Sequence, residues 1–514
     1  MLMVVGDVDI LNVLPPSPVA AEWGGWAGPV PAARPDSGDG RPTSRPTRGP
    51  TRRPSSPYPG ATYVPGDLSQ VKRGIRLSTG LDVRVLAHSG DEVRYRDGTT
   101  SRPLQFHNRP DAGHTFAIDP RRNPDLHARY PGGWVYVSNA ESSWDGGVGG
   151  LIFDGRGRVV EYRRLMTGTQ WNCGGGPTPW GTWISCEEPL TSMGRVGQIY
   201  EVDPFGGDVG MPIKPPTEKE IARAEARGRP LPPPTPPPLR GGRLTALGRE
   251  GGQYESFAFD VRDASRPRFF YTEDHRTGPI RRFTPRDPDL RWGTEGMLHG
   301  AGTVEYLAFR DREDDAKAEA AAARQGSYGG GFTHDERLGR TSGTYYWTTN
   351  KAEGEATAGD HFPFTEGIDV LDGKLYFACK SRQALFELEL DGGSRPRWSV
   401  TSTTGGAFDG RPDSLARVLH DTDEIMYFTE DGGDAAGVHG RDRDGNFFVV
   451  MESDLYSEET TGLAFSPDGK HMYVAYQKNG ILLDIWREDG HPFAGRTADI
   501  KYHSMANSDF QKRE

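Results

Sequence analysis

The sequence lacks several features that would place it in a specialised class of protein. It has three cysteines in 514 residues, and since they cannot all pair with one another, no disulfide framework is expected. It contains no run of about eighteen apolar residues, so we expect no membrane span. Basic residues are fewer than acidic ones, 61 against 72, which gives a net charge of -11. This balance argues against a surface for nucleic acid or anionic membranes and suits the binding of cations.

Export signals are weak at the start of the chain. No Lys or Arg precedes Arg34, and Asp7 and Asp9 interrupt the first apolar stretch, which is a poor match to a secretory signal. Much of 1–60 consists of Pro, Ser, Gly, Thr and Arg, so we predict a disordered leader there. We expect one folded domain over 61–500 and a C-terminal tail over 501–514. The sequence leaves the compartment and the oligomeric state open.

Glycine and proline, in contrast, are abundant. The chain has 68 Gly and 41 Pro, which favours many tight turns between short strands. Short β-like runs recur at 81–86, 133–137, 151–155, 268–272, 343–348, 374–378, 424–428 and 471–475. Segments 368–376 and 463–473 each have an apolar run, an Asp-Gly turn and a second run ending in Tyr, as in a β-hairpin. Repeated hairpins predict an all-β fold, a β-propeller, with a two-sheet sandwich or tandem all-β domains as the alternatives.

Two stretches break the β pattern. Residues 217–227 begin with a capping box formed by Thr217 and Glu220, and residues 311–325 are rich in Ala, Glu and Arg. Neither stretch has a strong apolar stripe. We therefore predict helical and Pro-rich surface insertions near 212–240 and 311–340.

The segment 172–188 concentrates chemically reactive side chains. Its glycine triplet, 174–176, suits a backbone in unusual dihedrals. A strand starting at Trp180 would place Glu187 and Glu188 on opposite faces. Cys173 would lie before this strand, in a Gly/Pro turn that returns its sulfur to the strand end beside Glu188.

A thiolate beside carboxylates suits a transition metal such as iron or zinc better than calcium alone, because soft sulfur selects against hard cations. The alternative is a buried free thiol, or a Cys173–Cys186 disulfide with solvated glutamates.

Other acidic side chains lie at or beside the ends of expected strands. With Glu188 they are Glu141, Glu255, Asp274, Glu366 and Glu459. In a propeller, loops from different blades converge on one axial face, so these acids would gather in one cleft. Such a cluster needs cations to relieve its repulsion. The alternative for each acid is an ordinary solvated turn residue.

Several phrases of the sequence resemble the motifs of one known family. Asn172-Cys173, Thr178-Pro179-Trp180-Gly181-Thr182 and Cys186-Glu187-Glu188 together resemble the motif of the PhoX-type alkaline phosphatases, a bacterial group once catalogued as a domain of unknown function. The resemblance continues in Val137–Glu141, Arg243–Gly248, Glu366–Ile368, Pro412–Leu415, Thr461-Gly462 and Phe465–Gly469.

The resemblance implies a six-bladed propeller whose axial pocket holds iron and calcium and hydrolyses phosphate monoesters and phosphodiesters. By motif position, it implies Cys173 as an iron ligand and Glu188, Glu255 and Glu366 as cluster carboxylates, and these four are the predicted catalytic residues. The further metal ligands implied are Asp274, Glu141 and Glu459, and the predicted substrate-binding residues are Asn139 and Lys478. The expected partner is a small phosphate ester, and the family resemblance favours a secreted or periplasmic protein.

The sequence departs from the family pattern at two positions. The family places an arginine two residues before the glutamate equivalent to Glu366, and this chain has Phe364 there, which offers no donor to phosphate. A family Gln-His-Pro-Gly phrase reads Gln477-Lys478-Asn479-Gly480 here, so a histidine is also lost. Lys351, His361 and Lys478 are the candidate replacements for the lost groups. A calcium-dependent lactonase-like propeller and a metal-stabilised binding scaffold without turnover are therefore kept as alternatives.

Overall fold

The computed structural model describes residues 68–493, apart from 69, 144, 190–195, 212–237, 288–296, 311–333, 336–338, 404–409, 419–424, 434, 442–446, 454 and 457. These residues all lie in the second of two compact units, Ser55–Glu514. The predicted leader, the tail and both predicted helices fall outside the described residues, so the predicted domain boundaries stay predictions. Within the described part, no helix has the length and apolar character needed to cross a membrane.

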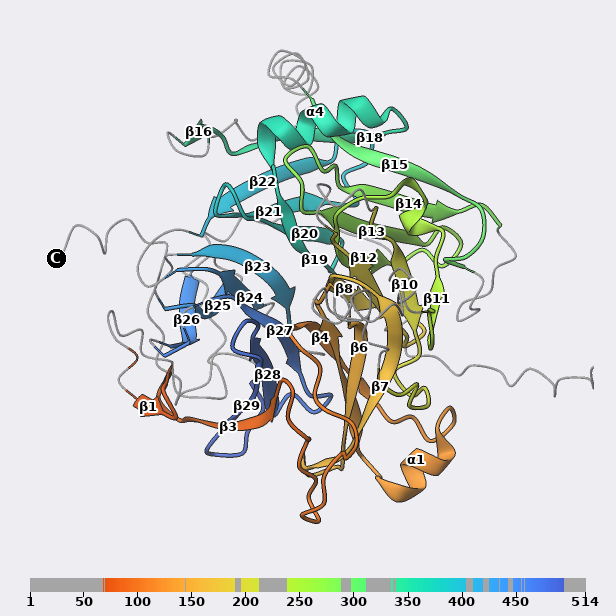
Figure 1. Cartoon of the computed structure of the whole chain (residues 1–514). Helices are drawn as coiled ribbons and strands as arrows, with labels where there is room; N and C mark the ends of the chain where they lie inside the picture. The colour runs from red at the N-terminus through yellow and green to blue at the C-terminus, as the bar shows by residue number, and fades with distance from the viewer. Residues whose placement is uncertain are drawn as a thin grey trace, which may run out of the picture. The chain divides into compact units, whose positions relative to one another are not determined.

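Antiparallel groups of four strands are the repeating unit of the fold (Figure 1). One sheet contains β4 (Pro110–Ala117), β5 (Trp134–Ala140), β6 (Gly146–Phe153) and β7 (Val159–Thr169). The next contains β8 (Asn172–Pro177), β9 (Trp183–Glu187), β10 (Ile199–Val202) and β11 (Gly242–Leu244). A third four-stranded sheet contains β27 (Thr460–Phe465), β28 (His471–Tyr476), β29 (Ile481–Arg487) and β3 (Leu81–His88).

Two further sheets are larger. The six-stranded sheet contains β23 (Arg411–Ala416), β24 (Met426–Asp431), β25 (Gly437–Arg441), β26 (Phe447–Glu452), β2 (Ile75–Leu77) and β1 (Gln70–Lys72). In the nine-stranded sheet, β18 (Ser342–Thr348) joins two groups of four: β12 (Tyr254–Asp260), β13 (Arg268–Glu273), β14 (Arg281–Pro285) and β15 (Gly302–Phe309), and β19 (Thr365–Leu371), β20 (Lys374–Cys379), β21 (Ala384–Glu389) and β22 (Arg397–Ser402). A separate ribbon pairs β16 (His334–Asp335) with β17 (Gly339–Arg340).

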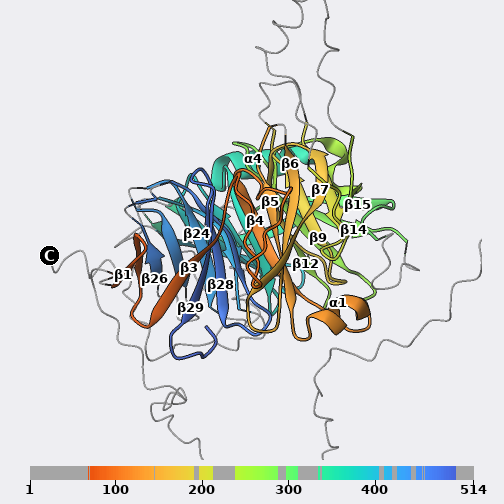
Figure 2. The same ribbon diagram turned by 60° about the horizontal axis from the view of Figure 1, so that its bottom comes forward.

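The first strand of each group lies in a closed ring. β4 contacts β8, β8 contacts β12, β12 contacts β19, β19 contacts β23, β23 contacts β27, and β27 returns to β4. The turned view in Figure 2 shows β3 beside β28 and β29, where this early strand completes the last sheet by pairing with β29. The predicted all-β propeller is confirmed. Because β18 merges two groups into one sheet, the sheets do not separate into six blades, and that number stays a prediction.

A separate apolar core fills each interface between neighbouring groups. Between the sheets of β28 and β5, for example, the rings of Tyr473 and Tyr136 lie 5.0 Å apart and both side chains are fully buried. The other interfaces hold cores of the same kind, built around Ile485, Val135, Phe257, Phe377 and Phe428. Burial of one such side chain contributes roughly 1.5–3 kcal/mol. The ring is thus held together by apolar contacts between sheets, which leaves its centre free for polar groups.

All eight predicted β-like runs overlap strands of the structure, although their ends differ from the observed strand ends. Both predicted hairpins form, as β19–β20 and β27–β28. Helix α4 (Lys351–His361) was not predicted, and neither were α1 (Pro124–Arg129) and the short 3-10 turn η2 (Leu247–Glu250). Helix α4 has weak apolar patterning, and it is capped by Asn350, whose side chain accepts from Ala352 N at 3.2 Å.

Two details of the segment 172–188 were predicted wrongly. Cys173 does not lie in a turn before the strand but within strand β8 itself, and β9 begins at Trp183 rather than at Trp180. The turn between them is closed by Thr178 N donating to Thr182 O at 2.8 Å. The glycine triplet does not adopt left-handed dihedrals. It allows close approach instead, because a Cβ on Gly174 would lie 1.9 Å from the carbonyl oxygen of Glu255 on β12.

Candidate metal centre

Each first strand of the ring carries an irregularity in its pairing with the second strand. The register shifts lie between Pro110 and Gly113, Asn172 and Gly175, Tyr254 and Phe257, Thr365 and Ile368, Pro412 and Leu415, and Thr461 and Ala464. A bulge leaves its residues unpaired and re-aims a side chain. The residues inside five of these bulges include Asp111, Cys173, Glu255, Glu366 and Asp413. The same local distortion therefore supplies, from each of these strands, one side chain of a type that can ligate a metal ion.

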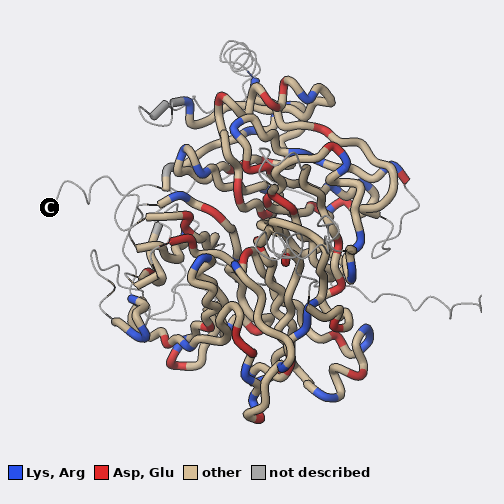
Figure 3. Tube along the Cα trace, in the orientation of Figure 1, with Lys and Arg blue, Asp and Glu red and all other residues tan. Residues whose placement is uncertain are grey.

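Positions beside strand ends contribute further groups at the same end, four of them at second strands and one, Glu459, at the start of a first strand. Glu141 directly follows β5, Glu188 directly follows β9, and Asp274 directly follows β13. Asp431 ends β24, and Glu459 precedes β27. We call the whole set the acid cluster: Asp111, Glu141, Cys173, Glu188, Glu255, Asp274, Glu366, Asp413, Asp431 and Glu459. Figure 3 shows acidic positions, in red, in the middle of the ring of strands.

Two groups within the acid cluster have the spacing of metal ligands. One ligand atom each from Cys173, Glu141 and Glu188 lies within 4.8 Å of the others. The same limit holds for Glu255, Glu366 and Asp413. The thiol of Cys173 donates to Glu255 Oε1 at 3.5 Å and so joins the two groups. The first group mixes sulfur and oxygen, while the second offers oxygen alone.

Burial and mutual repulsion govern the charge state of the cluster when no cation is present. Burial, reinforced by the charge of neighbouring carboxylates, raises the pKa of Glu188, Glu255 and Glu366 well above the usual value. Burial and then the charge of Asp111 raise the pKa of Glu141 to about 7. The pKa of the Cys173 thiol is likewise well above its usual value, because of burial and the charges of Asp111 and Glu255.

Such groups fit cations well. Within the described residues, Glu255 Oε2 and Asp274 Oδ1 are buried without a hydrogen-bond partner. A buried carboxylate oxygen without a donor costs free energy, and a bound cation would remove that cost. The donor set, one thiol among converging carboxylates, therefore fits the metal ions that the sequence resemblance implies.

Comparison with known proteins gives a family match and a structural match. The model of the family described as alkaline phosphatase PhoX matches residues 158–348, a segment that contains Cys173, Glu188 and Glu255. The resemblance to the PhoX family is confirmed. No curated protein matches the chain in a sequence comparison.

A structure of PhoX from Pseudomonas fluorescens, in complex with the transition-state analogue vanadate, shares 15% identity and aligns with a TM-score of 0.56. The alignment covers 84% of this chain and 99% of that PhoX chain. At this identity the match shows a common fold. The PQQ domain of a pyranose dehydrogenase from Coprinopsis cinerea is more distant, at 12% identity and a TM-score of 0.38, with 81% and 98% of the chains covered.

The structure brings together the residues that the PhoX resemblance predicted as metal ligands. Cys173, Glu188, Glu255, Glu366, Asp274, Glu141 and Glu459 all lie in the acid cluster. The three cysteines are free, so the alternative of a Cys173–Cys186 disulfide is wrong. The predicted opposite orientation of the two adjacent glutamates holds: Glu187 accepts the backbone N–H groups of Gln170 and Gln198 at 2.9 and 3.1 Å, away from the thiol.

The side chain of Asn139 holds the backbone of strand β8 at Cys173. Its amide nitrogen donates to the carbonyl oxygens of Cys173 and Gly174 at 2.8 and 2.7 Å. Its carbonyl oxygen accepts from Trp183 Nε1 and Ser185 Oγ, both at 2.9 Å. The whole side chain is therefore engaged in holding β8 and β9, which makes it a positioning residue. Its predicted contact with substrate stays a prediction.

Lys478, the other predicted substrate-binding residue, lies on the surface. Its side chain is 57% exposed and pairs with Glu458. Of the other candidate replacements for the missing PhoX arginine, Lys351 on α4 contacts Glu250 and Glu355, and His361 packs against Phe309. These contacts do not include a member of the acid cluster.

Sequence reasoning missed three basic residues that reach the acid cluster: Arg109, Lys380 and Arg411, whose guanidinium lies 3.7 Å from Asp431. Arg109 donates to Glu141 with Nε at 3.0 Å and also contacts Gln477. Lys380 follows β20, and its backbone N–H donates to Phe364 O at 3.0 Å. Its ammonium contacts Glu366 at 2.6 Å. Lys380 therefore places a positive charge beside Glu366, two residues after Phe364.

Asp111, Asp413 and Asp431 were also missed as cluster members. A repeated phrase could have found the first two, because Arg109-Pro110-Asp111 and Arg411-Pro412-Asp413 open β4 and β23 in the same way. The same triplet occurs at 34–36, so it is not specific by itself. Asp431 has no such signal.

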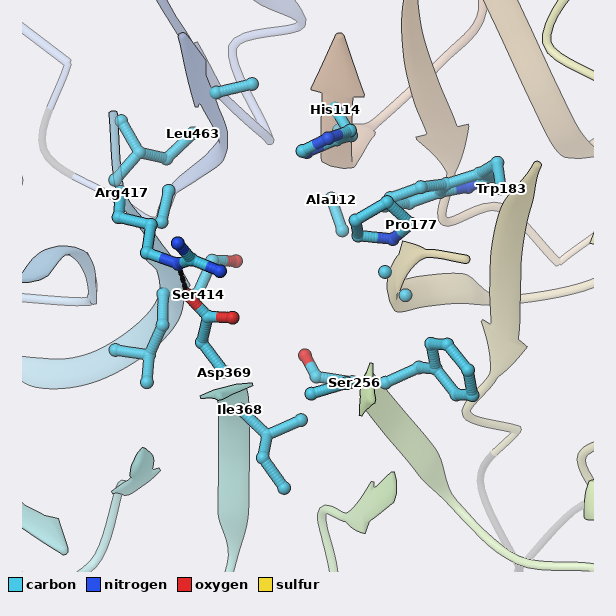
Figure 4. Close-up of a pocket in the computed structure, with 18 of the residues that line it drawn as sticks. Ala112, His114, Pro177, Trp183, Ser256, Ile368, Asp369, Ser414, Arg417 and Leu463 are labelled. Atoms are coloured by element: carbon cyan, nitrogen blue, oxygen red, sulfur yellow. Dashed lines mark hydrogen bonds and ion pairs between the residues drawn. The ribbon is translucent and has the colours of Figure 1, made fainter. Parts of the chain in front are cut away.

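A separate cavity of about 170 Å³ lies along the same six strands. In Figure 4, Ala112 and His114 line it from β4, Ser256 from β12, Ile368 from β19 and Ser414 from β23. Its charged lining is an ion pair between Arg417 and Asp369, 2.7 Å apart. Burial lowers the pKa of His114 to about 4, so this imidazole is neutral. Without a converging set of ligands, the cavity is a poorer candidate for chemistry than the acid cluster.

Proposed function

We propose that the chain is a PhoX-type metal-dependent phosphoester hydrolase, and that its metals are iron and calcium. The observation that carries this proposal is the arrangement of Cys173 with Glu141 and Glu188 within 4.8 Å, beside the oxygen-only group of Glu255, Glu366 and Asp413. The family match over residues 158–348 supports the same activity.

Ligand chemistry supports two kinds of ion. A thiolate with two carboxylates suits a transition metal such as iron, whereas three carboxylates suit a hard cation such as calcium. Deprotonation of the buried Cys173 thiol is unfavourable among carboxylates alone, so a bound metal ion is what would hold it as a thiolate. A calcium-dependent lactonase-like propeller gives no role to this thiol and is the weaker alternative.

The bound ions would neutralise charge on the phosphate oxygens and supply a hydroxide nucleophile at neutral pH. The chain's own residues position the ligands for this chemistry. Asn139 fixes the backbone on either side of the Cys173–Gly174 peptide, and Arg109 fixes the Glu141 carboxylate. Gln253 Nε2 donates to Glu188 Oε1 at 3.4 Å. No side-chain nucleophile is required.

The test is hydrolysis of p-nitrophenyl phosphate and of bis(p-nitrophenyl) phosphate by protein reconstituted with iron and calcium, beside elemental analysis of the same samples. Cys173→Ala and Glu188→Gln should lose both turnover and iron. Cys186→Ala is the matched control, because this thiol is also buried, on the neighbouring strand, but lies outside both ligand groups. Unchanged turnover in Cys173→Ala would refute the assignment.

A binding scaffold without turnover is the second candidate, and the observation that favours it is Phe364 in place of the family's arginine. The scaffold hypothesis predicts that the protein binds iron and calcium but hydrolyses neither ester. Calcium alone, with hydrolysis of a lactone, would support the lactonase-like alternative.

A further inference from the structure

The ammonium group of Lys380 is surrounded by carboxylates from three different strands. Nζ lies 2.6 Å from Glu366 Oε1, 3.0 Å from Asp274 Oδ2 and 3.2 Å from Asp431 Oδ2. These acids belong to β19, to the end of β13 and to β24. An ammonium has three N–H donors and no acceptor. Here it donates a hydrogen bond to Asp274 and forms ion pairs with Glu366 and Asp431.

The backbone fixes the origin of this side chain. Lys380 is the first residue after β20, and its N–H donates to Phe364 O at 3.0 Å, two residues before Glu366. Its side chain is 19% exposed, so the charge is largely removed from water. A lone charge at such a site would be costly, and the three carboxylates compensate it.

This surrounding resembles a cation site more than an ordinary ion pair. Several carboxylate oxygens from separate strands converge on one positively charged centre, which is how proteins bind calcium. The ammonium of Lys380 is the positive charge at this centre, and three carboxylate oxygens lie within 3.2 Å of it.

We infer that Lys380 takes the place of a divalent cation at the corner formed by Asp274, Glu366 and Asp431. The inference rests on the proposed metal-dependent function and deepens it. Asp274, predicted from the sequence as a metal ligand, would then bind the lysine. The ions would be confined to the Cys173 group and to the group of Glu255, Glu366 and Asp413. This chain would accordingly bind fewer ions than its carboxylates could hold.

The experiment counts bound ions. Wild-type protein and Lys380→Met are stripped with chelator, reloaded with calcium and iron, dialysed, and measured by elemental analysis and by calorimetric titration with calcium. We expect Lys380→Met to bind about one additional calcium per chain, because three carboxylates lose their ammonium and become available to a hard cation. Methionine keeps most of the volume of the lysine stem, and circular dichroism checks the fold.

Two further variants separate charge from packing. Lys380→Arg keeps the positive charge and should keep the wild-type ion count, so a gain of calcium in this variant would overturn the inference. The double variant Lys380→Met with Asp431→Asn removes one carboxylate of the vacated corner and should lose the additional ion. An additional ion that persists in the double variant would place it elsewhere and overturn the inference as well.

The outcome is independent of turnover. If Lys380→Met folds and binds the same number of ions as wild type, Lys380 does not replace a cation, whatever the phosphatase activity. If the wild-type protein binds metals without hydrolysing either ester, the proposed catalytic function fails while the ion counts still test the lysine.

Discussion

Replacement of Glu141 by glutamine should stabilise the metal-free protein at high pH, although it removes a group from the proposed metal centre. Glu141 is 8% exposed and lies beside Asp111 and Glu459 in the acid cluster. Burial and the charge of Asp111 disfavour its ionised form. Glutamine has nearly the same shape, and its carbonyl oxygen can still accept from Arg109. The change therefore removes the charge with little loss of packing.

The size and sign of the effect follow from proton linkage. The pKa of Glu141 is raised from 4.5 to about 7 in the folded protein. Between these values the folded state binds more protons than the unfolded state, so stability is full below pH 4.5 and is lost as the pH rises through about 7. A shift of this size corresponds to about 3 kcal/mol at pH 8. Glu141→Gln should recover up to that amount.

The assay is urea unfolding in the presence of EDTA at pH 5 and pH 8. The wild-type protein should lose more stability between these two values than Glu141→Gln does, by about 3 kcal/mol. Glu305→Gln is the control for loss of one carboxylate, since Glu305 pairs with Arg282 at 2.7 Å outside the acid cluster. If Glu141→Gln without metal is no more stable than wild type at pH 8, burial and the charge of Asp111 do not disfavour the ionised carboxylate of Glu141 as the structure indicates. Saturation with metal should reverse the order, because glutamine is a poorer ligand.

Three shorter predictions follow. Gly174→Ala should unfold or strongly destabilise the protein, because the added Cβ would lie 1.9 Å from Glu255 O, whereas Gly207→Ala, where a Cβ meets no atom within 4 Å, should leave the melting temperature nearly unchanged. Chelated wild-type protein should gain thermal stability as calcium is titrated back, and Glu255→Gln should show a smaller gain. Asn139→Ala should reduce iron content and lower the melting temperature, whereas a direct substrate contact alone would raise KM and leave iron content unchanged.

The sequence predicted the identity of most cluster members but not the distortion that gathers them. Cys173 stood out as a thiol near two glutamates, and Glu255 and Glu366 were found from family motifs. Alternation along a regular strand correctly separated Glu187 from Glu188, because β9 is regular there. The predicted Gly/Pro turn at Cys173 was wrong, since Cys173 lies within β8, at a register shift between Asn172 and Gly175.

Long-range pairing explains what was missed. No local sequence pattern distinguishes Lys380 from other lysines in turns. Its role depends on β19 and β24, which place Glu366 and Asp431 within 2.6 and 3.2 Å of its ammonium. Asp431 ends a strand without any local motif. The contact between β27 and β4 that closes the ring joins residues more than 300 positions apart, a separation at which local patterns carry no information.

Binding of the proposed metal ions would be coupled to folding in this architecture. The apolar interfaces between sheets hold the first strands in place, and the bulges then direct a thiol and carboxylates into the same small region. Without cations, these groups can be accommodated only if several carboxyls keep their protons, as the raised pKa values of Glu188, Glu255, Glu366, Asp413 and Glu459 indicate. Lys380 relieves this repulsion at one corner without any metal. Arg109 does the same for Glu141. The ions that would perform the chemistry would neutralise the carboxylates that remain and would also stabilise the ring that holds them.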